Sequence, residues 1–261
     1  MGKTIQCLLI LMLVFLGTIT SSFGGGMYFI QNKGQWSADI LFRAEIPGGF
    51  LFLKNKSFVY VLHDAAKVSA LHGKTPSQPL SPNAKFSPPI VPLINAHGVE
   101  VQFENADANI KHTQKHQVKS RFNYFLGNDQ SKWAGDVAAF EEIVYENIYK
   151  GIDLRVYVYD SKLKYEFIVH PHSDASQIKL KYEGATDVSI SETGQTIVKT
   201  SVGQFKEAQP YSYQMIHGKT QEVNTKILLS ENNRVQFFFP KDYRVQLYKN
   251  IKDFRRKEFD V

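Results

Sequence analysis

Cysteine is almost missing from this chain: Cys7, close to the N-terminus, is the one cysteine among 261 residues. If Cys7 is removed with a leader, the remaining chain has no disulfide, no thiol nucleophile and no thiolate ligand for a metal. Such a chain must be held together by its core. Roughly 235 residues suffice for one large β domain or two smaller ones, and 43% of the residues are hydrophobic.

Long hydrophobic runs are also scarce. The one such run, Cys7 to Leu16, follows Lys3 and precedes small and hydroxyl residues, which is the layout of a secretory signal peptide. It is shorter than the roughly 20 residues of a membrane-spanning helix. We therefore expect residues 1–24 to be a cleaved signal peptide. The mature protein would be secreted or held at the outer cell surface, with no transmembrane segment.

Basic residues are in modest excess, with a formal net charge of +6. Seven basic and four acidic residues lie between Lys241 and Val261, so this tail carries half of the excess. The body of the chain lacks a basic stripe interleaved with aromatic residues. We therefore expect no nucleic-acid partner.

What the chain has in abundance is alternation of apolar and polar residues. In "IDLRVYVY" (152–159) every second residue is aliphatic, which is typical of a strand that buries one face. The turns between such runs are too short for crossover helices, so we expect an all-β, antiparallel β-sandwich built from consecutive hairpins. One segment, "DVAAFEEIVYENIY" (136–149), is considered for a helix, although its β-branched and aromatic residues disfavour one. The other alternating runs are "ILFRAEI", "GFLFLK", "SFVYVL", "GVEVQF", "QIKLKYEG", "DVSISE", "QTIVKT", "YSYQMI" and "RVQFFF".

Proline is concentrated in one place, because six of the ten prolines lie between Pro76 and Pro92. Proline cannot serve a central strand, so we expect an extended loop inserted at residues 72–95. The predicted organisation is a signal peptide (1–24), a β-sandwich-like domain (25–240) that contains this loop, and a basic tail (241–261). Whether the part before the loop forms a separate domain stays open.

Four stretches of the chain occur together in a known family: "FIQNKGQW" (29–36), "FNYFLGNDQSKWAGDV" (122–137), "VYENIYKGIDLRVY" (144–157) and "YEFIVHPHSDASQIKLKYEGA" (165–185). In this order they resemble the N-terminal β-rich domain of unknown function found in exported proteins with SBBP-type β-propeller repeats and gliding-motility or type IX sorting regions. The resemblance covers about Met27 to Pro240. It implies an extracytoplasmic β-rich module with no assigned catalytic residues.

The chain departs from the family pattern at two points. The family stretch usually reads V-x-P-G-A-D-P-x-Q-I-x-L where this chain has "VHPHSDASQIKL", so His172 stands where a glycine is usual. Family members also continue past the "FFFP" strand into "IDP" and the repeats, whereas this chain continues into its basic tail. We therefore expect a shortened or frame-altered relative of a longer protein.

Two histidine pairs suggest metal sites at first sight. His170 and His172 flank a proline beside Asp174, but a metal site needs further ligands at a fixed separation. We expect a hairpin turn in which Asp174 bonds to its own backbone. His112 and His116 have the spacing of a helical zinc pair, yet no glutamate completes the motif and the neighbouring pattern is not helical. We expect a solvated strand or loop there, and no metal or cofactor.

The acidic residues give no clear catalytic pair. Glu141 and Glu142 are adjacent and would point to opposite faces of a strand. Asp153 follows a glycine turn, where hydrogen bonding to the turn is expected. A distant pair such as Asp153 and Glu166 would fit glycosidase chemistry only across a cleft. No nucleophile elbow, phosphate-binding loop or dinucleotide motif is present, so we expect no enzyme, with a glycan-active enzyme as the weakest alternative.

Four aromatic residues are candidates for stacking on a ligand: Trp36, Trp133, Tyr157 and Tyr159. Core packing is the usual role of a tryptophan. An exposed row of these rings would favour glycan binding, whereas burial would favour a scaffold. The sequence thus favours a non-catalytic structural or adhesive module that contacts the cell envelope or an extracellular glycan or protein. A carbohydrate-binding β-sandwich is the alternative.

Overall fold

The computed structural model of the chain describes residues 9–16, 27–72, 93–125, 127–160, 162–216 and 219–239. Most of the predicted proline-rich loop, and the whole predicted basic tail, lie outside these ranges. The described residues form twenty β-strands, one α-helix and two short 3-10 helices. The prediction of an all-β protein is confirmed.

The strands up to the middle of the chain are β1 (Leu9–Leu16), β2 (Phe29–Gln31), β3 (Ile40–Ile46), β4 (Gly49–Lys54), β5 (Ser57–His63), β6 (Ala96–Phe103), β7 (Lys111–Gln117), β8 (Phe122–Tyr124), β9 (Ala134–Val137) and β10 (Ala139–Tyr149). The later strands are β11 (Ile152–Tyr159), β12 (Lys162–Val169), β13 (Lys179–Glu183), β14 (Asp187–Ile190), β15 (Thr196–Thr200), β16 (Gly203–Glu207), β17 (Tyr211–Ile216), β18 (Lys219–Val223), β19 (Lys226–Ser230) and β20 (Arg234–Phe238). The helices are α1 (Ala65–His72), η1 (Gln130–Lys132) and η2 (Ala175–Gln177).

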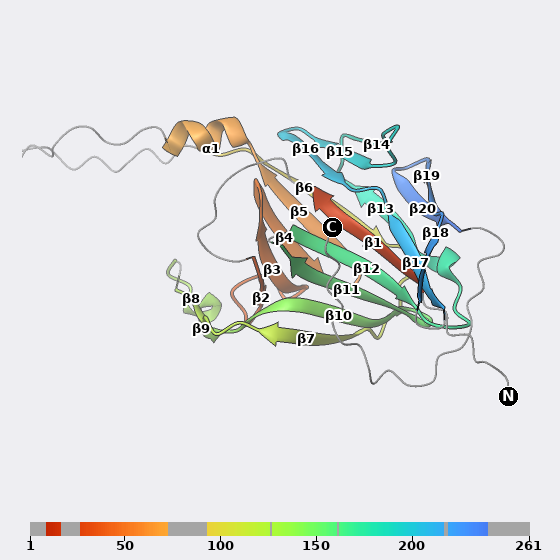
Figure 1. Ribbon diagram of the computed structural model, residues 1–261. Coiled ribbons are helices and arrows are strands. Elements are labelled where there is room, and N and C mark those ends of the chain that lie inside the picture. Colours follow the sequence, from red (N-terminus) through yellow and green to blue (C-terminus); the bar gives the residue numbers. More distant parts are fainter. Residues whose placement is uncertain are drawn as a thin grey trace, which may run out of the picture.

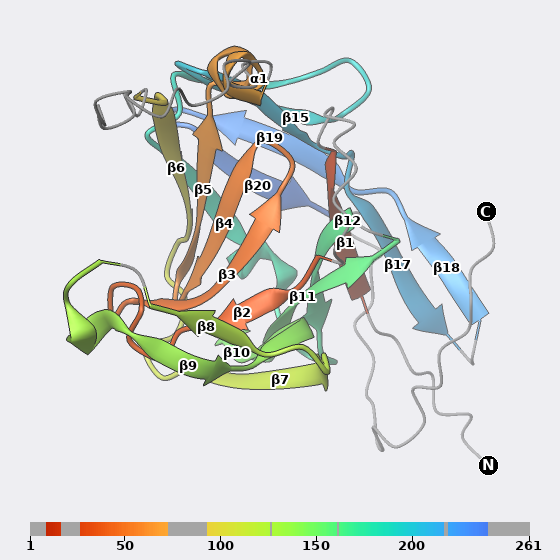
Figure 2. The same cartoon turned by 90° about the vertical axis from the view of Figure 1, so that its left-hand side faces the viewer.

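All strand pairings are antiparallel, as the hairpin pattern predicted. One continuous path of pairing runs β19–β20–β13–β6–β5–β4–β3–β2–β10–β11–β12–β1–β17–β18, with β7 on the other edge of β10. Strands β14, β15 and β16 form a smaller sheet, which touches the end of β1, and β8 pairs with β9. Figures 1 and 2 show that the path folds back on itself, so that its two halves face each other.

Aromatic side chains fill the space between the two halves of the sheet. The ring of Phe58 on β5 lies 5.8 Å from that of Tyr165 on β12 and 6.3 Å from that of Tyr145 on β10. The ring of Phe103 on β6 lies 6.2 Å from that of Phe167 on β12. These four contacting strands belong to opposite halves of the path, and the packed core between them gives the molecule its sandwich character.

Apolar residues of the alternating runs and of β12 are buried. Leu154, Val156, Phe167, Ile178 and Leu180 each expose 1% of their surface or less. Ile178 directly precedes β13, and the other four lie on the inward faces of β11, β12 and β13, so the period-two pattern of residues 152–159 identified the inward face of β11 correctly. Burial of this face is the main source of folding free energy in a domain with no disulfide among the described residues.

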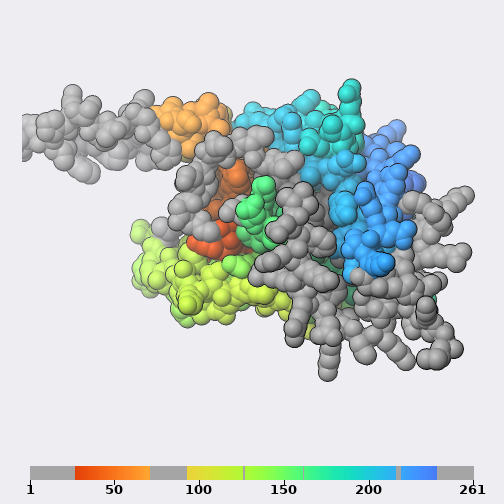
Figure 3. Space-filling view, viewed as in Figure 1, coloured from red at the N-terminus to blue at the C-terminus, as the bar shows by residue number. Residues whose placement is uncertain are grey.

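The α-helix found among the described residues is not at the segment that was considered for a helix. Residues 136–149 form parts of β9 and β10, as their β-branched and aromatic composition favours. Helix α1 follows Asp64, whose carboxylate accepts hydrogen bonds from the backbone N–H groups of Ala66 (3.1 Å) and Lys67 (3.2 Å). This is N-terminal capping of an alanine-containing segment with good helix propensity. In the space-filling view α1 stands out from one corner of the body (Figure 3).

Most of the apolar run of the predicted signal peptide is part of the sheet in the structure. Its residues Leu9 to Leu16 form β1, which lies between β12 and β17 (Figures 1 and 2). That residues 1–24 are a signal peptide, removed from the mature protein, stays a prediction.

Candidate ligand-binding cleft

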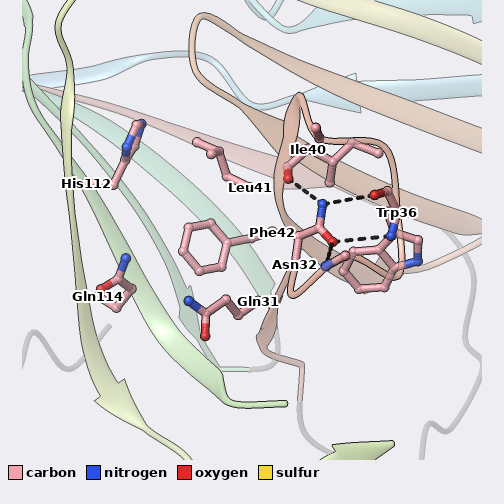
Figure 4. A pocket seen from close by; sticks show the side chains of 10 residues that line it. Gln31, Asn32, Trp36, Ile40, Leu41, Phe42, His112 and Gln114 are labelled. Carbon is pink, nitrogen blue, oxygen red and sulfur yellow. Dashed lines mark hydrogen bonds between the residues drawn. The ribbon is translucent and has the colours of Figure 1, made fainter. Parts of the chain in front are cut away.

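A cleft of about 500 Å³ opens between β7 and the segment that joins β2 to β3 (Figure 4). Its polar lining consists of the amide side chains of Gln31, Asn32 and Gln114 and the imidazole of His112, and the indole of Trp36 adds an aromatic wall. Apolar residues of β3 complete it. The cleft therefore combines hydrogen-bonding amides with a large aromatic surface.

Asn32 organises the loop on one side of the cleft. Its amide nitrogen donates hydrogen bonds to the backbone oxygens of Ser37 (2.9 Å) and Ile40 (2.8 Å), with a longer contact to that of Trp36 (3.4 Å). Its side-chain oxygen accepts from the N–H groups of Gly34 (3.0 Å) and Trp36 (3.2 Å), as Figure 4 shows in part. Gly34 has a φ of +109°, a conformation that L side chains rarely adopt. The "NKGQW" motif thus builds the loop that positions Trp36.

The indole of Trp36 is half-buried and held by its neighbours. Its ring meets the rings of Tyr124 (5.4 Å) and Phe52 (6.4 Å) nearly edge-on, and the guanidinium of Arg43 lies 5.6 Å from its centre. Such edge-on packing fixes the orientation of the ring while leaving part of it at the cleft. Trp36 is therefore fixed by packing and keeps part of its surface exposed.

Strand β7 supplies the opposite wall. The His112 ring meets the Tyr145 ring edge-on at 4.7 Å, and burial lowers the pKa of His112, so the imidazole is neutral at pH 7. Its Nε2 atom is buried and has no hydrogen-bond partner within the described ranges. Gln114, two residues further along the strand, is exposed. As expected, His112 and His116 lie on a largely solvated strand.

Trp133, the second candidate tryptophan, lies outside the cleft, next to the hairpin formed by β8 and β9. It is 40% exposed, and its ring meets the exposed ring of Phe125 at 5.8 Å. Its indole N–H donates to the backbone oxygen of Gly127 (3.2 Å). This aromatic pair is a surface feature rather than a core plug.

Tyr157 and Tyr159 lie on one face of β11, because every second residue of a strand points to the same side. The guanidinium of Arg155 lies 4.1 Å above the Tyr157 ring, and the ammonium of Lys164 lies 4.5 Å from the Tyr159 ring. Both rings thus have a cation at one face. The four candidate aromatic residues come from three separate elements, and only Trp36 lines the cleft.

A buried charge network that sequence reasoning missed joins β7, β10, β11 and β12. Arg155 donates to Glu142 (2.7 Å) and to Glu166 (2.9 Å), and Lys115 donates to Glu142 (3.0 Å). Both carboxylates are buried, whereas Glu141 is exposed, as expected of neighbours on opposite faces. The detectable signal was the pairing of Arg155 with Glu166 across the short hairpin from β11 to β12.

The two carboxylates of this network differ in pKa. Burial alone would raise the pKa of Glu142, but Arg155 and Lys115 outweigh burial and lower it. For Glu166, burial raises the pKa and Arg155 offsets only part of that effect. Since a single guanidinium bridges them, both groups act as sheet cross-links. Asp153 and Glu166, the distant pair considered from sequence, have different partners.

The "VHPHSD" stretch is a turn, as predicted. The Ser173 N–H donates to the backbone oxygen of His170 (3.1 Å), and the Asp174 carboxylate accepts from the N–H of Ser176 (2.9 Å) at the start of η2. His172 has a φ of +66°. This left-handed conformation is one that glycine adopts more readily than other residues.

His170 has a role that the sequence did not predict. Its Nε2 lies 2.7 Å from Asp153, whose other carboxylate oxygen accepts the N–H of Asn147 (2.7 Å). The hydrogen bond with Asp153 raises the pKa of His170. Burial alone would raise the pKa of Asp153, but His170 and Asn147 lower it. Asp153 thus pins the irregular end of β10, where Asn147 has a φ of +53°, in the turn role expected for it.

A third buried carboxyl, besides those of Glu142 and Glu166, lies on β16. Glu207 on β16 is 1% exposed and accepts a hydrogen bond from the hydroxyl of Tyr182 (2.6 Å). Burial raises the pKa of Glu207 to about 7, and the bond from Tyr182 opposes that rise. No cation pairs with Glu207 among the described residues, so its charged form is poorly stabilised.

Within the described ranges, no three histidine, cysteine, aspartate or glutamate side chains lie close enough together to hold a metal ion. None of the described helices is long and apolar enough to cross a membrane.

These features define an all-β, antiparallel domain with a small cleft of amide and aromatic character. The chain belongs to the family called domain of unknown function DUF7948, whose model matches residues 29–247. No curated protein and no solved structure matches it. The matched region begins after β1 and extends eight residues past Phe239, the last described residue.

Proposed function

We propose that the protein is a non-catalytic, extracytoplasmic adhesive module, secreted or held at the outer cell surface, and that it contacts glycans through the cleft beside Trp36. The resemblance to exported proteins with SBBP-type repeats and sorting regions supports the proposed location and context. The layout of residues 1–24 as a signal peptide supports it independently.

The observation that carries the proposal is the chemistry of the cleft. A sugar offers apolar ring faces, which stack on indole, and hydroxyl groups, which both donate and accept hydrogen bonds. Trp36 supplies the first contact, and Gln31 and Gln114 supply side chains that both donate and accept. The Trp36 ring is fixed by Tyr124 and Phe52, so little freedom is lost when a ligand binds.

The buried carboxylates support a non-catalytic role. Glu142 and Glu166 are both bonded to Arg155, and Asp153 is bonded to His170 and to a backbone N–H. A glycosidase needs one carboxyl group free to donate a proton and a second free to act on sugar or water. Here Glu142, Glu166 and Asp153 are engaged in holding strands together, which favours binding over catalysis.

The test is glycan binding by the chain from residue 25 onward, first on an array of bacterial and extracellular polysaccharides and then by calorimetry with the best ligand. Gln114→Ala removes an exposed cleft amide without disturbing the core, and we expect it to weaken binding about tenfold, the loss of roughly 1.4 kcal/mol. Trp36→Ala should abolish binding. Trp133→Ala, which changes an exposed tryptophan outside the cleft, is the matched control and should bind normally.

Two results would contradict the proposal. If Gln114→Ala binds as tightly as the unchanged chain while Trp133→Ala does not, the binding surface lies elsewhere. If purified protein releases reducing sugar from the bound polysaccharide, the module is catalytic.

A further inference from the structure

Strand β1 occupies a position between two strands that do not otherwise meet. It pairs with β12 over six residues, from Leu9 opposite Val169 to Val14 opposite Lys164. It also pairs with β17 over four residues, from Leu9 opposite Gln214 to Met12. Among the described strands no pairing joins β12 directly to β17. The two strands are therefore bridged by β1 (Figure 1).

Removal of residues 1–24 would leave a slot between β12 and β17 that is one strand wide. The domain family begins at Phe29, so β1 is not part of the matched domain. Both neighbouring strands would then present unpaired N–H and C=O groups along their edges. Open edges of this kind recruit another strand.

The lining of the slot is not purely apolar. On the buried side, β12 contributes Tyr165 and Phe167, and β17 contributes Ser212 and Gln214. The hydroxyl of Ser212 and the amide nitrogen of Gln214 are buried without a hydrogen-bond partner in the described part of the chain. The β1 sequence, LILMLVFL, carries no hydroxyl, amide or charged side chain. A strand with hydrogen-bonding side chains would suit this position better.

One segment of the same chain fits these requirements. The matched domain extends to Leu247, beyond β20, and Phe239 packs against the main core. Residues 243–248, "YRVQLY", lie outside the described residues and alternate Arg244, Gln246 and Tyr248 with Tyr243, Val245 and Leu247. The segment has six residues, the length of the ladder between β1 and β12. The face of Tyr243, Val245 and Leu247 can meet the buried lining, with the Tyr243 hydroxyl as its hydrogen-bonding group, while the charge of Arg244 stays on the outer side and the backbone pairs with both edges.

We propose that residues 243–248 fill the slot between β12 and β17 once residues 1–24 are removed, as a final strand of the domain. In the unprocessed chain the leader holds the same position and excludes this segment. The inference rests on the leader removal that is part of the proposed function.

Disulfide trapping tests the inference without any knowledge of the ligand. The chain from residue 25 onward contains no cysteine, since Cys7 is the only one in the sequence. Lys164→Cys places a thiol on the half-exposed face of β12, and a second cysteine is introduced at each position from 243 to 248 in turn. We expect cross-links at alternate positions, because only one face of a strand reaches that thiol. Phe254→Cys, in the basic tail, is the control and should not cross-link.

The unprocessed chain provides the second arm. With Cys7→Ser and the leader retained, the same cysteine pairs should cross-link several-fold less, because β1 occupies the slot. Cross-links at no position from 243 to 248 in the processed chain, or at all positions equally, would overturn the inference. So would equal trapping with and without the leader. Export itself is read separately from the N-terminal residue of the protein recovered outside the cell, so the two ideas fail independently.

A pair of deletions gives an independent readout. Removal of residues 251–261 should leave the melting temperature of the processed chain unchanged, because that stretch is highly charged with few apolar residues. Removal of 242–261 should lower it by several degrees, and addition of the 243–248 peptide should restore it. Equal melting temperatures for the two deletions would also overturn the inference.

Discussion

Glu207→Gln should make the protein more stable at alkaline pH and leave it nearly unchanged in acid. Glu207 is buried and its pKa is raised from 4.5 to about 7. Because the pKa of Glu207 is higher in the folded than in the unfolded state, the protonated group contributes its full stability below the unfolded-state pKa. This contribution is lost as pH rises through the folded-state pKa. Above pH 7 the folded state therefore bears a cost of about 3 kcal/mol, which is the shift converted at roughly 1.4 kcal/mol per pKa unit. Glutamine has the same shape and no charge, and its side-chain oxygen can still accept the Tyr182 hydroxyl.

The assay is urea unfolding of both proteins at about pH 5 and about pH 8.5, where the predicted difference changes by about 3 kcal/mol. Other titrating groups, including His170, are present in both proteins and cancel in the comparison. Glu141→Gln, at an exposed position on β10, is the control and should show no such pH dependence. The reasoning is refuted if the difference in unfolding free energy between Glu207→Gln and the unchanged protein is the same at both pH values. Glu207 would then either be exposed to solvent or have a countercharge in the folded protein.

Three further predictions concern the core and the turn. Leu180→Ala should cost about 2–5 kcal/mol of unfolding free energy, and a loss well below 1 kcal/mol would mean that β13 presents its other face to the core. His170→Ala should cost about 1 kcal/mol near pH 5.5, measured by urea unfolding. Because the pKa of His170 is raised and that of Asp153 is lowered, this cost should shrink as pH rises through the folded pKa of His170. His172→Gly should instead stabilise by a few tenths of a kcal/mol, since glycine accepts a φ of +66° without strain, and a loss of stability would contradict the turn geometry.

Local regularities in the sequence were enough to predict about half of the described strands, including β11 and β13, and their inward faces. The alternation of residues 152–159 identified β11 and its buried side, because a strand places every second residue on one face regardless of its neighbours. Helix α1 was not predicted because it is short and solvent-exposed, so it lacks a clear apolar face. Its main local feature is the capping carboxylate of Asp64.

The cleft and the charge network were harder to foresee because they depend on pairings between distant parts of the chain. Trp36 follows β2, which pairs with β10 more than a hundred residues later. Gln114 reaches the same cleft because β7 pairs with the other edge of β10. The packing of the whole sheet sets the register in which β10 pairs with β2 and β7, so a local sequence pattern does not predict these pairings.

The motifs that carry the family resemblance build turns rather than chemistry. In "NKGQW", Asn32 holds five backbone groups; in "ENIYKGID", Asp153 pins the irregular end of β10; in "PHSDASQ", Asp174 caps η2. Residues with such roles stabilise the fold, so their substitution should lower stability more than it alters binding at a folded site. Polar side chains without a hydrogen-bond partner in the fold are different, because a role in stabilising the fold does not account for their presence. Within the described residues, the Gln114 side chain in the cleft and the amide nitrogen of Gln214 at the slot are of this second kind, which is why ligand contacts are best sought at the cleft and strand exchange at the slot.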